Sequence, residues 1–404
     1  MPGSRLPCVA VLVLPVLLLF FTGVEILPPA RAAALSPGDG TTFQLEQKVR
    51  SAVLMDAASG RLLWAFNPDE RQPIASVTKI MTLVLALEAL QSGQVKETDP
   101  VLGSEHAKSM GGTQIWLEVG EELPYRDMLY AVAVGSANDA AVAIAEHLAG
   151  SEETFVARMN QRARELGMEN TYFANATGLP LEGKVTQNHY STARDVAWLS
   201  RHALTLPRFR ELVSTYEYTM RPDSLRRPVL YSYNRLLRRY PGLDGIKTGF
   251  TNEAGYCISA TAMRDGLRLI AVVLGASTRA DRDDAVTALL NWGFRSFERV
   301  TVAKERTRYG VVRLLRGYPE QVNVVLKETI SVTIPRGTKP NYSAEAQIDT
   351  DIRAPLAQGA TVGWLVLREG AKEIGRVPLV TESEVRRATI WEMVKRGVQQ
   401  LIRL

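Results

Sequence analysis

The alternation of hydrophobic and polar residues divides residues 45–297 into strands at both ends and helices in the middle. The pattern predicts two short strands around the Ser59-Gly60 turn, then helices, and finally three apolar runs rich in strand-forming residues before a last helix. We therefore expect an α/β (α+β) domain in which strands from both ends form a mixed sheet flanked by helices. The predicted strands lie within residues 51–66, 242–251, 255–264 and 267–277, and the predicted helices within residues 76–90, 125–150 (broken near Gly135-Ser136), 151–168, 191–204 and 281–297.

The pattern changes near residue 298, where the helical period disappears. Short β-branched runs then alternate with turns that contain glycine or proline, as far as residue 383. This texture predicts a small all-β domain, and a sandwich is the architecture that we expect. Residues 35–297 and 298–383 are accordingly predicted to form two separate domains.

The first 34 residues have the layout of a secretory signal peptide. Arg5 precedes an apolar run over residues 9–21, and Ala-x-Ala sequences end at Ala32 and Ala34, which are the two expected cleavage positions. The alternative is an uncleaved N-terminal anchor, but the run is short for a membrane span and contains Pro15. We expect residues 1–34 to be removed and the mature chain to lie outside the cytoplasmic membrane.

Residues 384–404 predict an amphipathic helix that runs from about Val385 to Leu404. Five basic residues and one acidic residue occur from position 385 onwards. A basic amphipathic helix that carries a tryptophan suits an anionic membrane surface, whereas the alternative is a helix docked on its own protein. The apolar side chains that share an arc of about 180° are Ile390, Trp391, Met393, Val394, Val398, Leu401, Ile402 and Leu404.

Composition and charge exclude few functions. The chain has 46% hydrophobic and 23% charged residues and a net charge of +5, all ordinary for a globular protein, and nucleic acid is not expected as a partner. Cys8 leaves with the signal peptide, and Cys257 reads as a buried apolar thiol. No metal or cofactor is expected, because the histidines are scattered and lack the H-E-x-x-H spacing or the company of a triad. They are His106, His147, His189 and His202.

The stretch "ASVTKIMT" places Ser76 and Lys79 three residues apart at the start of a helix. Residues at i and i+3 lie on the same helical face, so the amine can reach the hydroxyl. A serine is a weak nucleophile until a neighbouring base takes its proton, and the pair has the composition of a nucleophile and its base. Standing alone, the motif reads equally well as an N-cap serine followed by a solvated lysine.

Two further short motifs follow in an order that favours the catalytic interpretation. Ser136-x-Asn138 opens a long apolar helix, and "KTG" at residues 247–249 lies on a predicted strand. Each has a structural alternative, which is helix capping for Ser136 and an edge strand ending in a turn for the second motif. The order S-x-x-K, S-x-N, K-T-G is much less frequent by chance than any single motif.

The chemistry explains why these residue types are needed together. Ser76 would attack a carbonyl, and Lys79 must be neutral to accept its proton, a state favoured by burial and by a second cation such as Lys247. Ser136 would relay a proton to the leaving amine, and Asn138 would hold a substrate amide.

The third motif suits the other end of the substrate. Lys247 and Thr248 would bind a terminal carboxylate, and Gly249 would leave room for the substrate along the strand. The backbone N–H groups of Ser76 and Phe250 would form the oxyanion hole.

With these motifs the chain resembles the penicillin-binding D-alanyl-D-alanine carboxypeptidases, the low-molecular-weight DD-peptidases. The resemblance is dense over residues 45–297 and includes "FVARMNQRARELGMENTYFANATGL" and "YPGLDGIKTGFTNEAGYCISATA". It implies a β-lactamase/DD-transpeptidase-like catalytic domain and removal of the terminal D-alanine from peptidoglycan stem pentapeptides through an acyl-serine, with β-lactams as covalent inhibitors. The family's carboxylate-binding arginine would fall on Arg282, although Arg279 is near. Phe250 stands where some members carry histidine.

Two other functions share parts of this pattern. Class A β-lactamases have the same motifs but add a Glu-x-x-Leu-Asn loop, and the corresponding segment here contains Glu169 and Glu182 without that sequence. A non-catalytic wall-binding or β-lactam-sensing protein would keep the fold, but binding alone does not require the base. The carboxypeptidase is therefore the function that the sequence favours.

Overall fold

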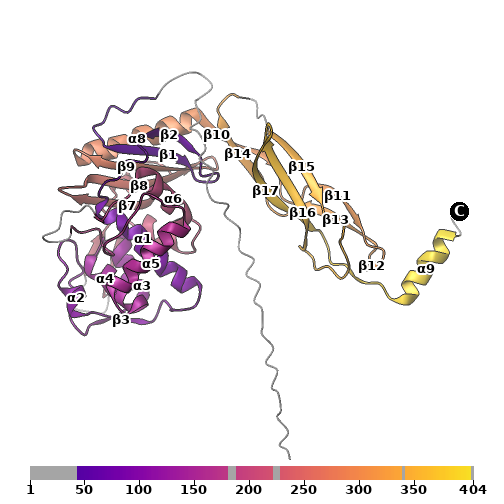
Figure 1. Cartoon of the computed structure of the whole chain (residues 1–404), viewed down its shortest axis with the longest axis horizontal. Helices are drawn as coiled ribbons and strands as arrows, with labels where there is room; N and C mark the ends of the chain where they lie inside the picture. Colours follow the sequence, from indigo (N-terminus) through magenta and orange to yellow (C-terminus); the bar gives the residue numbers. More distant parts are fainter. Residues whose placement is uncertain (1–42, 181–187, 222–227, 339–341, 402–404) are drawn as a thin grey trace, which may run out of the picture.

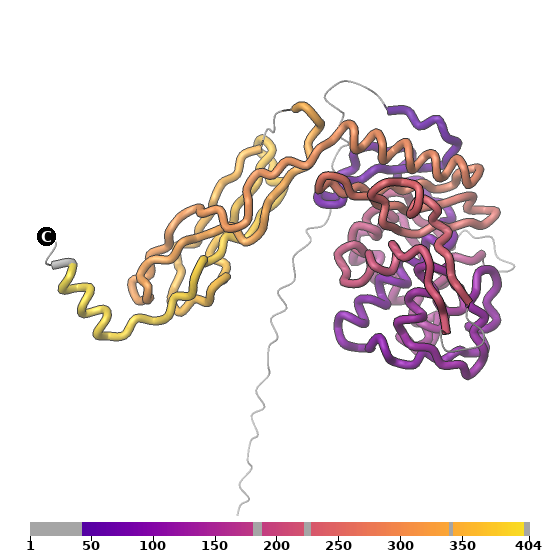
Figure 2. The backbone as a smooth tube through the Cα atoms, turned by 180° about the vertical axis from the view of Figure 1, so that it is seen from behind, coloured from indigo at the N-terminus to yellow at the C-terminus, as the bar shows by residue number. Residues whose placement is uncertain are grey.

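The computed structural model describes residues 43–180, 188–221, 228–338 and 342–401. These residues form three parts (Figure 1). A helix-rich part, which ends at Ser296 and carries the three predicted catalytic motifs, is called the catalytic part below. An elongated β part extends from Phe297 to Arg387, and a terminal helix follows it. The trace seen from behind shows the β part projecting from one corner of the catalytic part (Figure 2). The predicted signal peptide lies outside the described residues.

A five-stranded sheet in the order β2-β1-β9-β8-β7 forms the frame of the catalytic part. Strands from both ends of the region pair in it as predicted, but every neighbouring pair is antiparallel, so the expectation of a mixed sheet is wrong. Short turns join β7 to β8 and β8 to β9, and such connections produce antiparallel neighbours. The strands are β1 (Ser51–Asp56), β2 (Leu62–Phe66), β7 (Leu243–Thr251), β8 (Gly255–Arg264) and β9 (Leu267–Ala276).

Both faces of this sheet are covered by helices. One apolar core lies between the sheet and most of the helices, and a second lies between the sheet and α8. Helix α1 is buried on nearly all sides, which explains its nearly continuous apolar sequence. The helices are η1 (Ala75–Thr78), α1 (Lys79–Gln91), α2 (Glu105–Lys108), α3 (Tyr125–Ala133), α4 (Asn138–Ala149), α5 (Glu152–Glu165), α6 (Ala193–Ala203), α7 (Phe209–Ser214), η3 (Arg235–Arg238) and α8 (Arg279–Ser296).

Two small ribbons complete the catalytic part. Strands β3 (Pro100–Leu102) and β4 (Glu122–Pro124) pair before α3, and β5 (Glu217–Thr219) and β6 (Val229–Tyr231) pair before β7. Strand β3 packs near α4, so the segment between β3 and β4 can reach the start of that helix.

The β part begins directly where α8 ends, at Phe297. A five-stranded antiparallel sheet packs against the β10–β14 pair over a small apolar core, which confirms the predicted sandwich. Alternating apolar residues in these strands supply that core. The strands are β10 (Phe297–Ala303), β11 (Arg308–Arg313), β12 (Gly317–Tyr318), β13 (Gln321–Leu326), β14 (Ile330–Pro335), β15 (Tyr342–Ile348), β16 (Thr361–Glu369), β17 (Lys372–Thr381) and β18 (Arg386–Arg387).

The terminal helix α9 (Ile390–Leu401) begins later than the sequence predicted. Val385 is fully buried in the β part, and the following two arginines form β18, so the expected start near Val385 is wrong. Thr389 and Glu392 form a capping box, in which Thr389 Oγ1 accepts from Glu392 N and the Glu392 carboxylate accepts from Thr389 N. Figure 1 shows α9 at the end of the β part that is remote from the catalytic part.

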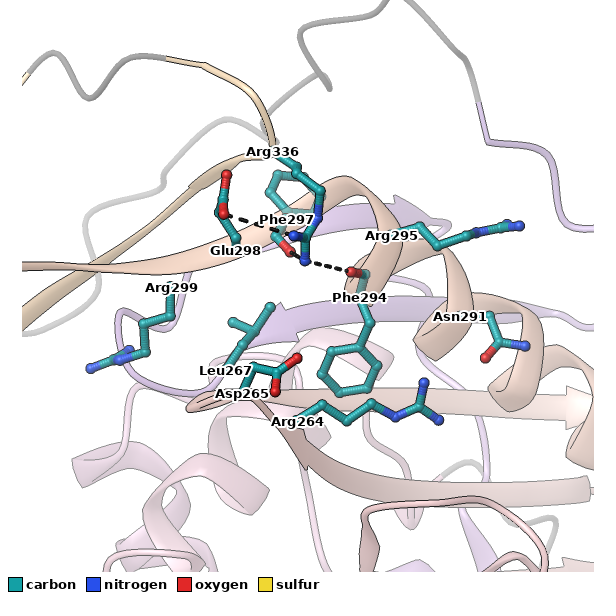
Figure 3. A pocket seen from close by; sticks show the side chains of 10 residues that line it. All are labelled: Arg264, Asp265, Leu267, Asn291, Phe294, Arg295, Phe297, Glu298, Arg299 and Arg336. Carbon is teal, nitrogen blue, oxygen red and sulfur yellow. Dashed lines mark hydrogen bonds and ion pairs between the residues drawn. The ribbon is translucent and has the colours of Figure 1, made fainter.

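A pocket of about 650 Å³ lies where the catalytic and β parts meet. Figure 3 shows Phe294 and Leu267 near its centre, whereas Arg295 and Arg299 point to opposite sides. Arg336 is engaged with the Phe294 carbonyl oxygen and with Glu298. Because Arg336 follows β14 and Phe294 lies in α8, their hydrogen bond joins the β part to the catalytic part beside this pocket.

Candidate active site

Ser76 lies in the 3₁₀ turn η1, directly before the buried helix α1. The residue before it, Ala75, has φ of 48°, a left-handed conformation that is uncommon for a residue with a side chain. Such strained backbone is typical of functional sites. Ser76 is partly exposed, whereas Lys79 is completely buried. The hydroxyl is therefore accessible while the amine beside it is shielded from water.

Lys79 makes three hydrogen bonds at the bottom of the site. Its Nζ lies 3.1 Å from Ser76 Oγ, 2.5 Å from Asn138 Oδ1 and 2.8 Å from the Thr177 carbonyl oxygen. Burial, and then the positive charge of Lys247, hold the pKa of Lys79 well below its ordinary value, although the Asp139 carboxylate opposes this. A lysine in this environment can be neutral near physiological pH, which is the state that a base requires.

Lys247 approaches the same site from strand β7. Its Nζ donates to Ser136 Oγ at 2.9 Å, and the Lys247 side chain is also buried. Burial and the charge of Arg282 lower the pKa of Lys247 to about 7. Ser136 itself has φ of 56° and precedes α4 without capping it, since the N-cap residue is Ala137 and makes no side-chain cap. The structural alternative of simple helix capping by Ser136 is thus not what the geometry shows.

Both ends of the Asn138 side chain are bonded within the protein. Its oxygen accepts from Lys79, and its amide donates to the Gly111 carbonyl oxygen at 2.7 Å. The backbone N–H of Asn138 also donates to the Thr113 carbonyl oxygen at 2.7 Å. The amide nitrogen carries a second hydrogen that the Gly111 bond does not use, so the contact with a substrate amide that the sequence predicted remains chemically possible. In the structure, Asn138 links Lys79 to the loop between β3 and β4.

Sequence reasoning missed Asp139, which fixes this loop. Its buried carboxylate accepts from the backbone N–H groups of Ile115 and Leu117, each at 3.0 Å. The two donors flank Trp116, which has φ of 53° and is 71% exposed. Asp139 thereby holds the loop that in turn holds Asn138. The acidic residue directly after S-x-N was the signal that was available in the sequence.

The KTG strand lies directly against the Ser76 turn. A Cβ atom at Gly249 would be 2.7 Å from the Ile74 carbonyl oxygen and 3.0 Å from the Ser76 nitrogen, so a side chain there would displace the turn. Strand β7 is at the edge of the sheet formed by the described residues, and an edge strand can accept an extended peptide. Phe250 follows Gly249 and is half exposed. The structure therefore brings the predicted oxyanion residues, Ser76 and Phe250, to the same edge.

Thr248 and Arg282 are both buried near this edge. Arg282 lies in the first turn of α8, and its Nε and one terminal nitrogen both donate to Asp283 Oδ1, at 2.9 Å and 2.7 Å. Its charge is close enough to lower the pKa of Lys247. Arg282 therefore adds positive charge near the KTG strand, and its role in binding a carboxylate stays a prediction.

His189 supports the turn η1, which contains Ser76, through a hydrogen bond to Thr78. Its Nδ1 accepts from the Ala174 backbone N–H at 3.1 Å, which leaves Nε2 to donate to Thr78 Oγ1 at 2.7 Å. Burial, and then the charge of Lys79, lower the pKa of His189 to about 4, so the ring is neutral at physiological pH. Both nitrogens are engaged, and His189 is therefore a positioning residue. The sequence around His189 gave no indication of this positioning role.

The fold and these motifs define a class. An antiparallel sheet flanked by helices, with S-x-x-K, S-x-N and K-T-G brought together at its edge strand, is the arrangement of the active-site serine enzymes that comprise penicillin-binding proteins and class A β-lactamases. The D-alanyl-D-alanine carboxypeptidase family (peptidase family S11) matches residues 39–278, and the C-terminal domain of penicillin-binding protein 5 matches residues 297–387. The chain belongs to the D-alanyl-D-alanine carboxypeptidase family, a family of serine peptidases.

Individual relatives are similar in sequence to this chain over most of its length. The D-alanyl-D-alanine carboxypeptidase DacF of Bacillus subtilis (strain 168) is 38% identical over 375 residues, 93% of this chain and 95% of that protein. DacC of Escherichia coli (strain K12) is 35% identical over 374 residues, 88% of this chain and 91% of that protein. The crystal structure of penicillin-binding protein 5 from Haemophilus influenzae is similar with a TM-score of 0.67 and 32% identity, covering 86% of this chain and 100% of that one. The resemblance and the fold class predicted from the sequence are confirmed.

Proposed function

We propose that this chain is a serine D-alanyl-D-alanine carboxypeptidase that removes the terminal D-alanine from peptidoglycan stem pentapeptides, with Ser76 as nucleophile and Lys79 as base. The observation that carries the proposal is the position of Lys79 Nζ, 3.1 Å from Ser76 Oγ in a buried site that lowers its pKa. Family membership supports the reaction, and the geometry supports the roles of the residues.

Acylation begins when Ser76 Oγ attacks the carbonyl of the penultimate D-alanine and its proton passes to Lys79 Nζ. The negative charge that develops on the carbonyl oxygen is stabilised by the N–H groups of Ser76 and Phe250. As the tetrahedral intermediate collapses, the C–N bond breaks and the leaving amine takes a proton through Ser136, which lies next to Lys247. Water then hydrolyses the acyl-serine and regenerates the hydroxyl.

The carboxylate of the leaving D-alanine is bound at the other end of the site. Lys247 and the Thr248 hydroxyl contact it, with the Arg282 charge behind them. Because the pKa of Lys247 is about 7, its charge is available at and below neutral pH. The same charge helps to keep Lys79 neutral, so one cation serves both substrate binding and activation of the base.

A β-lactam presents a strained amide and a carboxylate at a spacing similar to that between the scissile amide and the terminal carboxylate of D-Ala-D-Ala. It therefore acylates Ser76, and we expect this acyl-enzyme to persist. A β-lactamase would need a base that activates water against this ester. Glu169 is exposed at the surface, and Glu182 lies outside the described residues. Family membership favours the carboxypeptidase.

The reaction is tested by the release of free D-alanine from a diacyl-Lys-D-Ala-D-Ala peptide. Wild-type protein should release one equivalent of D-alanine per peptide, and Ser76→Ala should release none above background because the nucleophile is missing. Penicillin added before the peptide should block the reaction. Peptide that remains intact with the wild-type protein, while penicillin still binds, would instead support a β-lactam-sensing protein.

The proposal extends to the location of the enzyme. The predicted signal peptide would direct the chain across the cytoplasmic membrane, and α9 would hold it on the outer face, facing the cell wall. Several apolar side chains of α9 are exposed, including Ile390 at 78% and Trp391 at 76%, which favours a membrane surface over docking on the protein. The exposed Lys395 adds attraction to anionic lipids, whereas Arg396 donates to the Gly317 carbonyl oxygen at 2.7 Å and fixes the helix to the end of the β part. In the described part of the chain, no helix has the length and apolar character needed to span a bilayer.

Removal of residues 390–404 should release the mature enzyme from membranes without changing peptide cleavage. Each large apolar side chain that is fully buried contributes roughly 1.5–3 kcal/mol, so the loss of the apolar arc of α9 should abolish binding. Truncation at residue 389 keeps the buried Val385 and β18 in place. The measurement is sedimentation with anionic vesicles.

Two point variants refine this test. Trp391→Glu should weaken vesicle binding, and Trp391→Phe should largely preserve it. A truncated mature protein that still sediments with the vesicles would show that the anchor lies elsewhere.

A further inference from the structure

An open groove of about 820 Å³ begins where the KTG strand ends. Phe250 and Asn252 line it together with Tyr256 of the neighbouring strand β8 and with Gly275 and Ser277 at the end of β9. It is therefore continuous with strand β7, which carries Lys247, Thr248 and the oxyanion residue Phe250. None of the roles given above to site residues requires this groove.

The direction of the substrate leads into the groove. Under the proposed function, the terminal carboxylate lies at Lys247 and Thr248, and the acyl carbonyl lies at Phe250. An extended substrate and a β-strand both advance by about 3.3 Å per residue. Each substrate residue that precedes the acyl D-alanine therefore lies about one strand residue further along β7, beyond Phe250. The part of the stem peptide upstream of the scissile bond must therefore pass Thr251 and Asn252, at the mouth of the groove.

Two cationic residues, Lys48 and Arg50, line the groove. Among the described residues that line it, none is an aspartate or a glutamate. Both cations belong to the extended segment before β1, which is pinned to the end of β9. The Arg50 backbone N–H donates to the Leu274 carbonyl oxygen at 3.1 Å, and the Lys48 carbonyl oxygen accepts from Ser277 N at 3.1 Å. These bonds hold the two cations at the groove.

The Arg50 side chain packs against the backbone of Gly275. Gly275 has φ of 69°, and a Cβ atom there would lie 2.6–2.8 Å from the Cβ, Cγ and Cδ atoms of Arg50. The aliphatic part of Arg50 thus crosses the backbone where only glycine leaves room. One guanidinium nitrogen donates to the Glu253 carbonyl oxygen at 2.8 Å, which fixes the guanidinium beside the β7–β8 turn.

An aromatic pair forms the remaining wall. The rings of Phe250 and Tyr256 lie 4.3 Å apart, and the Phe250 side chain is half exposed. Such a surface suits the methylene groups of a long side chain, whereas the cations beyond it suit a terminal negative charge. The two features together match an acidic side chain on an aliphatic stem.

We propose that this groove is a subsite for the residue preceding the acyl D-alanine and that Arg50 and Lys48 select a side chain ending in a carboxylate. The proposal rests on the proposed function, because that function sets the direction of the substrate. It assigns the segment before β1 to substrate recognition and makes Phe250 part of two sites, one through its backbone and one through its ring.

The test compares two peptides of equal length, Nα-acetyl-Glu-D-Ala-D-Ala and Nα-acetyl-Gln-D-Ala-D-Ala, by release of D-alanine. Wild-type enzyme should have a higher kcat/KM on the glutamate peptide. Arg50→Gln and Lys48→Gln should each lower that value by about three- to fivefold, as expected for solvent-exposed ion pairs, and should change the value for the glutamine peptide by less than about twofold. Arg50→Lys should retain most of the preference.

Arg295→Gln is a matched control, because Arg295 is an exposed arginine at the opposite end of α8, beside the junction pocket (Figure 3). It should leave both peptides unaffected. Equal losses on the two peptides in the groove variants, or no loss at all, would overturn the subsite. If the wild-type enzyme released D-alanine from neither peptide while a diacyl-lysyl peptide also stayed intact, the proposed function itself would fail.

Discussion

Lys79→Ala should lower the rate of acylation by penicillin by about 1,000-fold or more. The variant loses the amine that lies 3.1 Å from Ser76 Oγ, and no second base is positioned to replace it among the described neighbours of Ser76. His189 also lies close to the turn that contains Ser76, but its two ring nitrogens are hydrogen-bonded to Thr78 Oγ1 and to the Ala174 backbone N–H. The measurement is the second-order rate constant of acylation, followed with a fluorescent penicillin.

The control must separate loss of the base from loss of the fold. Lys79 is buried and satisfies both the Asn138 side-chain oxygen and the Thr177 carbonyl oxygen, so its removal also leaves unpaired acceptors. Lys79→Met fills most of the volume, and both variants should be compared by thermal unfolding. Lys108→Ala removes an exposed lysine paired with Glu118 and should acylate normally. A folded Lys79 variant with less than a tenfold loss would exclude Lys79 as the base.

Much of the fold could be predicted from periodicity. Helix α8 and strands β7 to β9 have long, regular patterns, and the change of pattern predicted near residue 298 lies one residue after the start of β10 at Phe297. The direction of strand pairing was harder, because β1 and β9 are distant in sequence and only tertiary contacts determine that they pair antiparallel. The start of α9 was misplaced because the apolar Val385 fits a helical pattern equally well, although it packs in the β part.

The site could be predicted to the extent that its chemistry is carried by short motifs. Spacing alone indicated that Ser76 and Lys79 share a face, and their distance of 3.1 Å agrees with that expectation. The contact between Lys247 and Ser136 depends on how β7 packs against the start of α4, and no local pattern encodes it. Family resemblance supplied the pairing that the spacing could not.

The supporting residues were less predictable, because they act through backbone groups. The Thr177 carbonyl oxygen bonds to Lys79, and any residue type with the same backbone conformation would present it. Asp139 acts on the N–H groups of a loop more than twenty residues away. Neither interaction produces periodicity or a motif, so only the folded chain identifies them.

Identification of the residue that penicillin modifies tests the central claim most directly. Ser76 is partly exposed in a strained turn beside a buried lysine with a lowered pKa, and these features support its proposed role as the nucleophile. Mature protein treated with penicillin, digested and examined by mass spectrometry should carry the complete penicillin mass once per chain, on the peptide that contains Ser76. Ser76→Ala should remain unmodified while keeping its unfolding temperature. An adduct on another residue, or an unmodified wild-type protein, would contradict the account.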